Sequence, residues 1–304
     1  MSLLVLSEEE VERLLTMEEC IEAMADVLAA LARDELYQPL RFVVRPPAAA
    51  GLIGLMPAHR AGADSAYALK EIVITPGNPA RGLDAHQGAV LVHDGETGEL
   101  RAIMNASPIT AIRTAAVSAV ATRALARPGS RVVAIVGSGV QGKAHAEAMR
   151  AVLGEPEIRT WSRRDGGTAE TIVRGADVVC TCTTSRDPVL HRDWLDPGTH
   201  VNAVGASVPT HRELDEATIR DATLVVDRRE SALNEAGELA IPGFGEEQIA
   251  AELGEVLTGA HAGRGSDEEI TVFKSLGLAV EDLAAADLVV RKAREQGAGT
   301  EVPF

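Results

Sequence analysis

Three glycines with the spacing Gly-x-Gly-x-x-Gly come directly after the apolar run 132–136, and a helical pattern follows over 145–152. In a strand–turn–helix setting the first glycine permits a tight turn, and the second lets the backbone approach a pyrophosphate. The third lets helix and strand pack closely, and the helix N-terminus offers amide donors to phosphates. The pattern predicts a Rossmann-type dinucleotide site made by Gly137, Gly139, Val140, Gln141 and Gly142.

The residues after the next predicted strand, 157–161, favour a phosphorylated ribose. An NAD site usually has an acidic residue here, about 20 residues beyond the glycines, that binds the ribose hydroxyl. This chain has Ser162, Arg163 and Arg164 instead, and guanidinium groups pair with phosphate through charge-assisted hydrogen bonds. Asp165 follows at once and is an alternative ribose ligand. We therefore expect NADP(H) as the cofactor, with NAD(H) as the less favoured alternative.

Three basic residues outside the glycine loop are candidates for binding an acidic substrate. Lys70 shares strand parity with apolar residues of the predicted strand 67–74, although that face is alternatively exposed, with Glu71 inward. Arg113 lies among small apolar residues of a predicted helix, where it needs a partner anion. That anion is either a substrate carboxylate or an internal carboxylate. Arg41, on the predicted strand 40–45, is alternatively a surface arginine.

The elements that must position these residues fall into two patterns. Residues 8–14 and 17–33 predict helices that begin with capping boxes, and a run of short strands separated by turn signals predicts a mostly antiparallel sheet. A long helix follows Ser107 and Pro108, and from 131 onward strands and helices alternate, as in a parallel sheet. The expected strands are 40–45, 52–56, 67–74, 89–93 and 100–104, then 131–136, 157–161, 177–180, 200–204 and 223–226; the expected later helices are 108–126 and 276–295.

Composition narrows the class of protein. The formal net charge is −16 and no basic cluster is present, which argues against a nucleic-acid partner. No apolar run is long enough to span a membrane, and the first residues lack the basic start of a signal peptide. Three scattered cysteines do not make a disulfide framework, and Cys180 and Cys182 fit a buried strand better than a metal site. We expect a cytoplasmic enzyme that acts on a small molecule and binds no metal.

Taken together, these segments resemble the ornithine cyclodeaminase/mu-crystallin family over nearly the whole chain. The resemblance rests on the glycine loop, the strand that carries Lys70, and the segments Gln38–Arg41, Gly54–Pro57, Ile112–Ala116, Val201–Ser207, Arg212–Leu214, Thr271–Gly277 and Val280–Asp282. It implies an α/β protein with a Rossmann-type domain at 119–277. A mostly antiparallel α+β domain, 1–118 with 278–304, would bind substrate and form a homodimer.

The resemblance also implies roles for single residues. Arg41, Lys70 and Arg113 match positions that hold a substrate carboxylate and polarise the reacting centre. Met56 and Ser207 match positions that line the same pocket. Thr183 and Val204 join the residues expected to contact the cofactor. His86 is a weaker candidate for relaying a proton, with a structural role as its alternative.

Two departures from the cyclodeaminase pattern decide the expected branch. Ser207 stands where cyclodeaminases carry an aspartate, and Gly54 stands where they carry a glutamate. Both changes are similar to mu-crystallin-type ketimine reductases. We therefore expect NADPH-dependent reduction of cyclic ketimine acids, Δ1-pyrroline-2-carboxylate or Δ1-piperideine-2-carboxylate, to L-proline or L-pipecolate. The alternatives are an ornithine cyclodeaminase, an alanine-type amino-acid dehydrogenase, and a non-catalytic NADPH-binding carrier.

A third departure concerns the length of the chain after Arg164. Only about a dozen residues separate Arg164 from the strand predicted at 177, where a doubly wound fold usually has a full helix and another strand. We expect a parallel sheet that is one strand narrower and more open where the adenine would lie.

Overall fold

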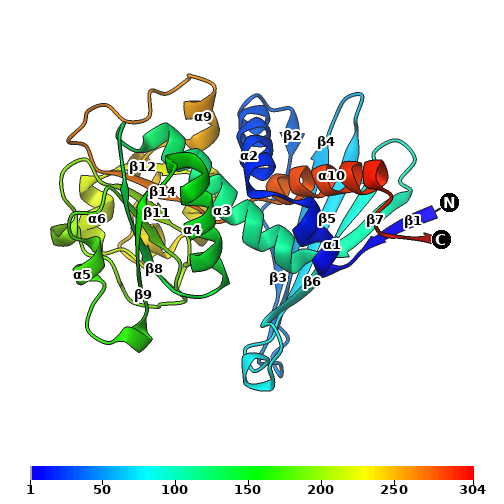
Figure 1. The fold of residues 1–304 in the computed structure, drawn as a ribbon, viewed down its shortest axis with the longest axis horizontal. Helices are drawn as coiled ribbons and strands as arrows, with labels where there is room; N and C mark the ends of the chain where they lie inside the picture. The colour runs from blue at the N-terminus through cyan, green and yellow to red at the C-terminus, as the bar shows by residue number, and fades with distance from the viewer. Residues whose placement is uncertain (1) are drawn as a thin grey trace. The chain divides into compact units, whose positions relative to one another are not determined.

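A computed structural model describes residues 2–304, apart from the side chain of Pro79, and these residues form two compact units. Unit 1 contains the chain up to Arg113 together with Leu278–Phe304, and unit 2 contains Thr114–Gly277. The first boundary lies inside helix α3 (Ala106–Leu125), slightly before the position after residue 118 expected from the sequence. Each unit is built around its own sheet (Figure 1).

Unit 1 contains an eight-stranded sheet in the order β15-β1-β7-β6-β5-β4-β2, with β3 paired to β4. Only the β1–β7 pair is parallel among the described pairs, so the expectation of a mostly antiparallel sheet is confirmed. The strands are β1 (Ser2–Leu6), β2 (Leu36–Tyr37), β3 (Phe42–Val44), β4 (Leu52–Arg60), β5 (Ala66–Ile74), β6 (His86–Asp94), β7 (Leu100–Asn105) and β15 (Thr300–Pro303).

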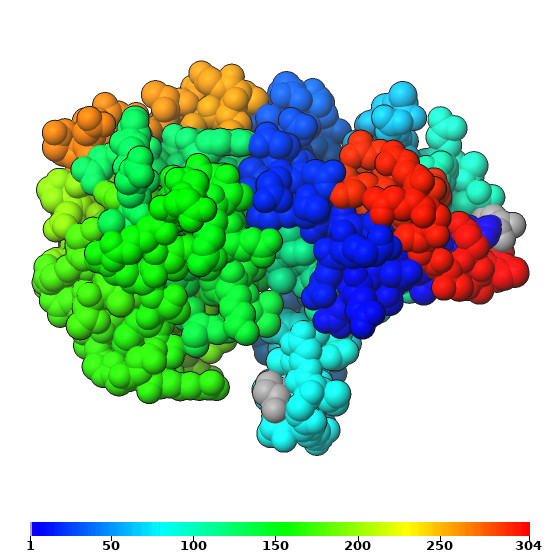
Figure 2. All heavy atoms as spheres, in the orientation of Figure 1, coloured from blue at the N-terminus to red at the C-terminus, as the bar shows by residue number. Residues whose placement is uncertain are grey.

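Three helices of unit 1 pack together, and one of them covers the sheet. They are α1 (Glu8–Leu14), α2 (Met17–Ala32) and α10 (Ala279–Gln296). Helix α10 contacts β4, β5 and β6 as well as α1 and α2, so residues from the two ends of unit 1 share one core. Figure 2 shows α10 in red beside the dark blue N-terminal helices. The expected capping box of α1 is present at Ser7; at Thr16, the N-cap of α2, the side chain accepts the backbone N–H of Glu19, but Glu19 accepts from the Thr16 hydroxyl and the reciprocal backbone bond is not formed.

Unit 2 contains a seven-stranded sheet in the order β13-β12-β14-β11-β10-β8-β9, and every described pair in it is parallel. Two of its strands, β13 and β14, were not expected from the sequence. Its strands are β8 (Val132–Val136), β9 (Glu157–Trp161), β10 (Val178–Thr181), β11 (His200–Ala203), β12 (Thr223–Val226), β13 (Ile249–Glu252) and β14 (Thr271–Lys274); its helices are α4 (Val140–Leu153), α5 (Glu170–Val173), α6 (Glu216–Asp221), α7 (Arg229–Glu235), α8 (Gly237–Ala240) and α9 (Leu253–Leu257).

Strand β9 forms one edge of this sheet, with β8 as its neighbour. After β9 the chain makes a single 3-10 turn, Arg163–Asp165, and the four-residue helix α5, and then enters β10 on the far side of β8. Among the described residues no strand lies beyond β9. The expectation that the sheet lacks the strand usually found there is therefore confirmed.

Candidate functional sites

A cluster of buried charged side chains in unit 1 centres on Lys70, in the middle of β5. Lys70 is 1% exposed, so the predicted inward orientation is confirmed and the exposed alternative is wrong. Its Nζ lies 2.7 Å from Oδ2 of Asp282, in the first turn of α10. The pairing of β4, β5 and β6 places Met56, Lys70 and Val90 in one row across the sheet. Directly opposed residues share a sheet face, so Met56 stands beside the lysine on the helix-covered side.

Arg113 joins the same cluster from helix α3. Its Nε lies 3.0 Å from Oδ1 of Asp282, and its Nη1 lies 2.6 Å from Oε2 of Glu281. The internal ion pair that the sequence left open is therefore present. These two carboxylates accept two of the five N–H donors that a guanidinium carries in a fixed fork, so Arg113 can still donate to a substrate carboxylate. Asp282 therefore bridges Lys70 and Arg113, one through each of its carboxylate oxygens.

The cluster shifts the acidity of Lys70 in a direction that suits proton transfer. Burial, the largest cause, and the positive charges of Arg113 and Arg41 together lower the pKa of Lys70 to about 8, against the opposing effect of Asp282. An ammonium with such a pKa gives up its proton near neutral pH far more readily than an ordinary lysine. A buried cationic group with this acidity and two arginines nearby is suited to bind a carboxylate and to donate a proton beside it.

Arg41 lies just before β3, not within the strand expected over 40–45. In the β3–β4 pair Phe42 is opposite Leu55, so the same register continued by one residue places Arg41 opposite Met56, at the end of the Lys70 row. Its charge acts on the pKa of Lys70. Nearby, Gln38 accepts a hydrogen bond from the backbone N–H of Val280 at 3.0 Å, which ties the segment before β3 to the start of α10.

His86 lies outside this cluster. It begins β6 opposite Ile74, four residues along the strand from Val90, and its side chain is exposed and 4.0 Å from Asp84. The geometry brings Lys70, Arg113, Met56 and Arg41 together and leaves His86 apart.

The glycine loop of unit 2 has the geometry of a phosphate cradle. Gly137 has φ +126°, in the region that favours glycine, and a Cβ there would lie 2.4 Å from the carbonyl oxygen of Cys182. A Cβ on Gly142 would lie 2.0 Å from the carbonyl oxygen of Gly137, so close packing of α4 on the loop requires this glycine. Gly139, the N-cap of α4, has open space around it. The loop therefore fits the dinucleotide that its sequence predicts.

The turn after β9 contains Ser162, Arg163, Arg164 and Asp165. Asp165 accepts hydrogen bonds from the backbone N–H of Ser162 at 2.7 Å and from its hydroxyl at 2.9 Å, which ties the carboxylate into its own turn. Arg163 donates from Nη2 to the hydroxyl of Ser185 at 2.7 Å. Both arginines have exposed side chains at the edge of the sheet.

The remaining predicted residues follow neighbouring strands at the same sheet edge as the glycine loop. Thr183 comes after β10, and Val204 and Ser207 come after β11. In open α/β sheets, ligands bind outside the carboxyl ends of the strands, where these residues stand. A buried carboxylate, Glu213, accepts hydrogen bonds from Thr183 and from Gly205, and so joins the two loops.

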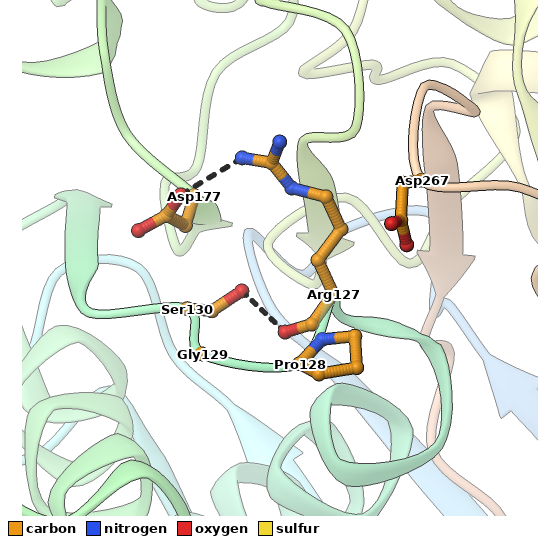
Figure 3. Close-up of a pocket in the computed structure, with 6 residues that line it drawn as sticks. All are labelled: Arg127, Pro128, Gly129, Ser130, Asp177 and Asp267. Atoms are coloured by element: carbon orange, nitrogen blue, oxygen red, sulfur yellow. Dashed lines mark hydrogen bonds and ion pairs between the residues drawn. The ribbon is translucent and has the colours of Figure 1, made fainter.

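A separate pocket lies at the opposite, amino edge of the unit 2 sheet (Figure 3). Arg127 and Asp177 form an ion pair in it, at 2.9 Å between Nη2 and Oδ1. The lining residues precede β8, β10 and β14, whereas the glycine loop follows β8. This pocket is therefore not the cofactor site. It is lined by Arg127, Pro128, Gly129, Ser130, Asp177 and Asp267.

Sequence reasoning assigned no role to Glu281, Asp282, Gln38 or Glu213. Adjacent carboxylates at the start of an apolar helix were the available signal for the first two, because such charges are costly to bury without cationic partners. Across the described chain no group of three or more His, Cys, Asp or Glu side chains is placed to hold a metal ion. The helix search over the same residues finds none long and apolar enough to cross a membrane.

A doubly wound parallel sheet with this glycine loop defines a dinucleotide-binding protein of the Rossmann class. Residues 1–172 and 166–297 match the model of the ornithine cyclodeaminase/mu-crystallin family, and the chain belongs to this family. The match is made in two parts that meet at 166–172, inside the shortened connection after β9.

Similar proteins of known type agree with this assignment. Ketimine reductase mu-crystallin of Mus musculus is 42% identical over 270 residues, which covers 84% of each chain. An archaeal alanine dehydrogenase dimer with bound NAD has a TM-score of 0.94 at 34% identity, with all of both chains covered. The Δ1-pyrroline-2-carboxylate reductase of Thermococcus litoralis, in complex with NADH and L-proline, has a TM-score of 0.91 at 35% identity, over 98% of this chain and 100% of that one. The chain is an oxidoreductase of this family.

Proposed function

We propose that the protein reduces cyclic ketimine acids, Δ1-pyrroline-2-carboxylate or Δ1-piperideine-2-carboxylate, to L-proline or L-pipecolate with NADPH. The observation that carries the proposal is the buried Lys70, with a pKa of about 8, beside Arg113 and near Arg41. The similar proteins support the proposal, because they include a ketimine reductase and a reductase in complex with NADH and L-proline.

In this reaction the chain binds and orients the imine acid and supplies a proton. Arg41 and Arg113 would hold the carboxylate, which fixes the orientation of the ring relative to Lys70. The ammonium of Lys70 would hold the imine nitrogen by a hydrogen bond and pass its proton there as the C=N bond becomes a C–N single bond. Asp282 keeps the ammonium in place. The loop of Gly137, Gly139 and Gly142 would hold the phosphates of NADPH, whose chemistry when bound is hydride transfer to the imine carbon.

The residues at positions 54 and 207 argue against cyclodeamination of ornithine. That reaction needs carboxylates to activate water and to hold the side-chain amine, and Gly54 and Ser207 provide none. The nearest carboxylates of the cluster, Glu281 and Asp282, already pair with Arg113 and Lys70. Similarity to an alanine dehydrogenase supports a second candidate of the same class, reversible deamination of a small amino acid.

A direct assay separates these functions. The purified protein is incubated with each cyclic imine acid and NADPH or NADH, with L-alanine and NAD, and with L-ornithine, and cofactor oxidation and ammonia are followed. We expect NADPH oxidation with the cyclic imines. Ornithine cyclisation without imine reduction would refute the proposal, and cofactor binding without turnover on any substrate would support a carrier instead.

The pH profile of the reduction should report Lys70. We expect kcat/KM for the imine acid to fall about tenfold per pH unit above about pH 8, because the pKa of Lys70 is about 8 and the proton donor is its charged form, which is present below that pH. The profile is measured between about pH 6 and pH 10 with saturating NADPH, and NADPH affinity is measured at each pH as a control. A profile that stays level to about pH 9.5 would contradict the role of Lys70.

The preference for NADPH is proposed to depend on Arg163. A 2′-phosphate would take the place of the Ser185 hydroxyl as the acceptor of its guanidinium. We expect Arg163→Ala to raise the KM for NADPH about tenfold and to leave the KM for NADH unchanged, since a hydrogen bond between charged groups is lost only with the phosphorylated cofactor. Arg159→Ala, on β9, the strand that leads into this turn, is the control. An unchanged KM for NADPH in Arg163→Ala would overturn the NADP(H) preference.

We also propose a homodimer formed through the sheet of unit 1. The face opposite Lys70 carries exposed apolar side chains in register on β3 and β5, including Phe42, Val44 and Val73, each 43% to 56% exposed. An apolar patch of this kind on a sheet marks an interaction surface.

We also propose a cytoplasmic location. The three cysteines are free, which supports it.

The dimer is tested by placing charges on this face. We expect the unaltered protein to have twice the chain mass of 31.9 kDa in light scattering, and Val44→Asp with Val73→Asp to have the mass of a single chain. Two buried carboxylates without partners cost several kcal/mol in an interface, enough to dissociate it. Val302→Asp, on the edge strand β15, is the control. A variant that remains dimeric would place the interface elsewhere.

A further inference from the structure

The carboxylate of Glu213 in unit 2 is fully buried and accepts four hydrogen bonds. Its Oε1 accepts hydrogen bonds from the backbone N–H and the hydroxyl of Thr183, both at 2.7 Å. Its Oε2 accepts from the backbone N–H of Gly205 at 2.6 Å and from the hydroxyl of Thr181 at 2.8 Å. Two of these donors are amides that only donate, so the arrangement is made for an ionised carboxylate.

Thr183 and Gly205, which donate to Glu213, follow β10 and β11; β10 is paired with β8, and β11 is the next strand beyond β10. Their loops are also pressed together, since a Cβ on Gly205 would lie 2.0 Å from the carbonyl oxygen of Thr183. The loop after β10 in turn meets the glycine loop, because Cys182 limits the space at Gly137. A shift at Glu213 would therefore reach the backbone that shapes the cradle.

Two further buried charged residues, Glu238 and Lys274, hold the segment that carries Glu213. Its backbone N–H donates to Oε1 of Glu238 at 2.9 Å, and Oε2 of Glu238 lies 3.1 Å from Nζ of Lys274. Lys274 donates to the carbonyl oxygen of Ala206 at 2.6 Å, next to Ser207. Burial raises the pKa of Glu213, and the positive charge of Lys274 and the hydrogen bonds of the threonines oppose that rise. The ends of β10, β11 and β14 are thus joined through one polar network.

We propose that Glu213 is a positioning residue for the dinucleotide site, which sets the loops after β10 and β11 so that they fit the cofactor. The inference rests on the proposed function in one respect, that this sheet edge binds a nicotinamide dinucleotide. Glu213 touches neither cofactor nor substrate in this role. It acts through Thr183 and Gly205, which donate to its carboxylate. A buried side chain of another shape would leave these donors without an acceptor.

The test compares Glu213→Gln with Asp177→Asn. An amide in place of the Glu213 carboxylate turns an NH2 group toward a backbone N–H, which cannot accept, so one loop loses its anchor. Asp177 is the matched control at the other edge of the same sheet (Figure 3), where it accepts from the amides of Arg131 and Val132 at 2.8 and 3.0 Å and pairs with Arg127. Both variants remove one charge from a carboxylate that binds two backbone amides.

Three quantities are measured for each variant: the dissociation constant for NADPH by its fluorescence, amide hydrogen exchange over 182–186 and 204–208, and the thermal midpoint. We expect Glu213→Gln to raise the dissociation constant about tenfold and to speed exchange in both segments. Asp177→Asn should also lower the midpoint, with affinity and exchange in those two segments unchanged. If Glu213→Gln does not fold, Thr181→Val removes one donor only and should give a smaller change of the same kind.

Two results would count against the inference. Equal NADPH affinity and equal local exchange in Glu213→Gln and the unaltered protein would show a role in stability alone. Equal loss of affinity in Asp177→Asn would show that any weakening of the sheet has the same effect. Failure of the unaltered protein to bind NADPH or NADH would instead refute the proposed function, so the two failures are distinguishable.

Discussion

Lys70→Met should lower kcat for the imine acid by about 10²- to 10⁴-fold while NADPH binds as before. Removing a positioned proton donor costs a rate factor of this size, and the cofactor loop belongs to unit 2. The methionine fills a similar volume, and Asp282 keeps its pair with Arg113 at 3.0 Å, so the buried carboxylate is not left alone. The protein should therefore fold, with loss confined to the chemical step.

The control for this prediction is Lys292→Met. Lys292 also pairs with a carboxylate of unit 1, that of Glu19, but lies on the other end of α10 from Asp282. We expect its kcat to stay within a factor of about two, because partly exposed ion pairs contribute little. Turnover and NADPH affinity are measured for both variants. A Lys70→Met enzyme with more than about a tenth of the original kcat would rule out Lys70 as the proton donor.

Gly139→Ala should weaken NADPH binding by about 10- to 100-fold with little change in folding stability. No atom lies within 4 Å of a Cβ at this position, so the methyl group meets nothing in the protein itself. It would instead occupy the space through which the pyrophosphate reaches the N-terminus of α4, where lost charge-assisted hydrogen bonds are worth about 1.5–3 kcal/mol. The loss of a glycine N-cap and the stiffer unfolded chain nearly offset each other in stability.

Gly142→Ala gives the contrasting outcome. Its Cβ would lie 2.0 Å from a backbone oxygen, so both the thermal midpoint and NADPH affinity should fall. Gly77→Ala, in a loop of unit 1 with open space around it, should alter neither. Calorimetry and fluorescence titration distinguish the three variants. If Gly139→Ala bound NADPH as tightly as Gly77→Ala, the phosphates would have to lie away from this loop.

Features encoded by neighbouring residues could be predicted from the sequence. The glycine loop, the helix N-caps at Ser7 and Thr16, and the shortened connection after β9 each depend on a few consecutive residues or on chain length alone. The fold class and the family followed from them. The inward orientation of Lys70 needed the structure, because the alternation of β5 fits either face until helix α10 is placed over one of them.

Other features depend on residues far apart in the chain. The partners of Arg113 are 168 and 169 positions away, and no local pattern pairs them. Strand β14 is four residues long and buried throughout, so it shows no alternation to recognise. Strand β4 continues past Pro57 to Arg60, although proline usually ends a strand. It is tolerated because β3 begins opposite Leu55 and β2 ends opposite His59, so on that side of β4 no described strand pairs with Pro57.

The interrupted sequence of unit 1 sets an order for its completion on the ribosome. Thr114–Gly277 is continuous, so unit 2 can fold as soon as it emerges. Unit 1 has to wait, because α10, which is synthesised after all of unit 2, carries the carboxylates that neutralise Lys70 and Arg113. Until then closure of the nascent sheet would bury two cations without partners, which is costly. The lysine thus acquires its lowered pKa only in the last step of assembly, and no partly synthesised chain holds a working proton donor.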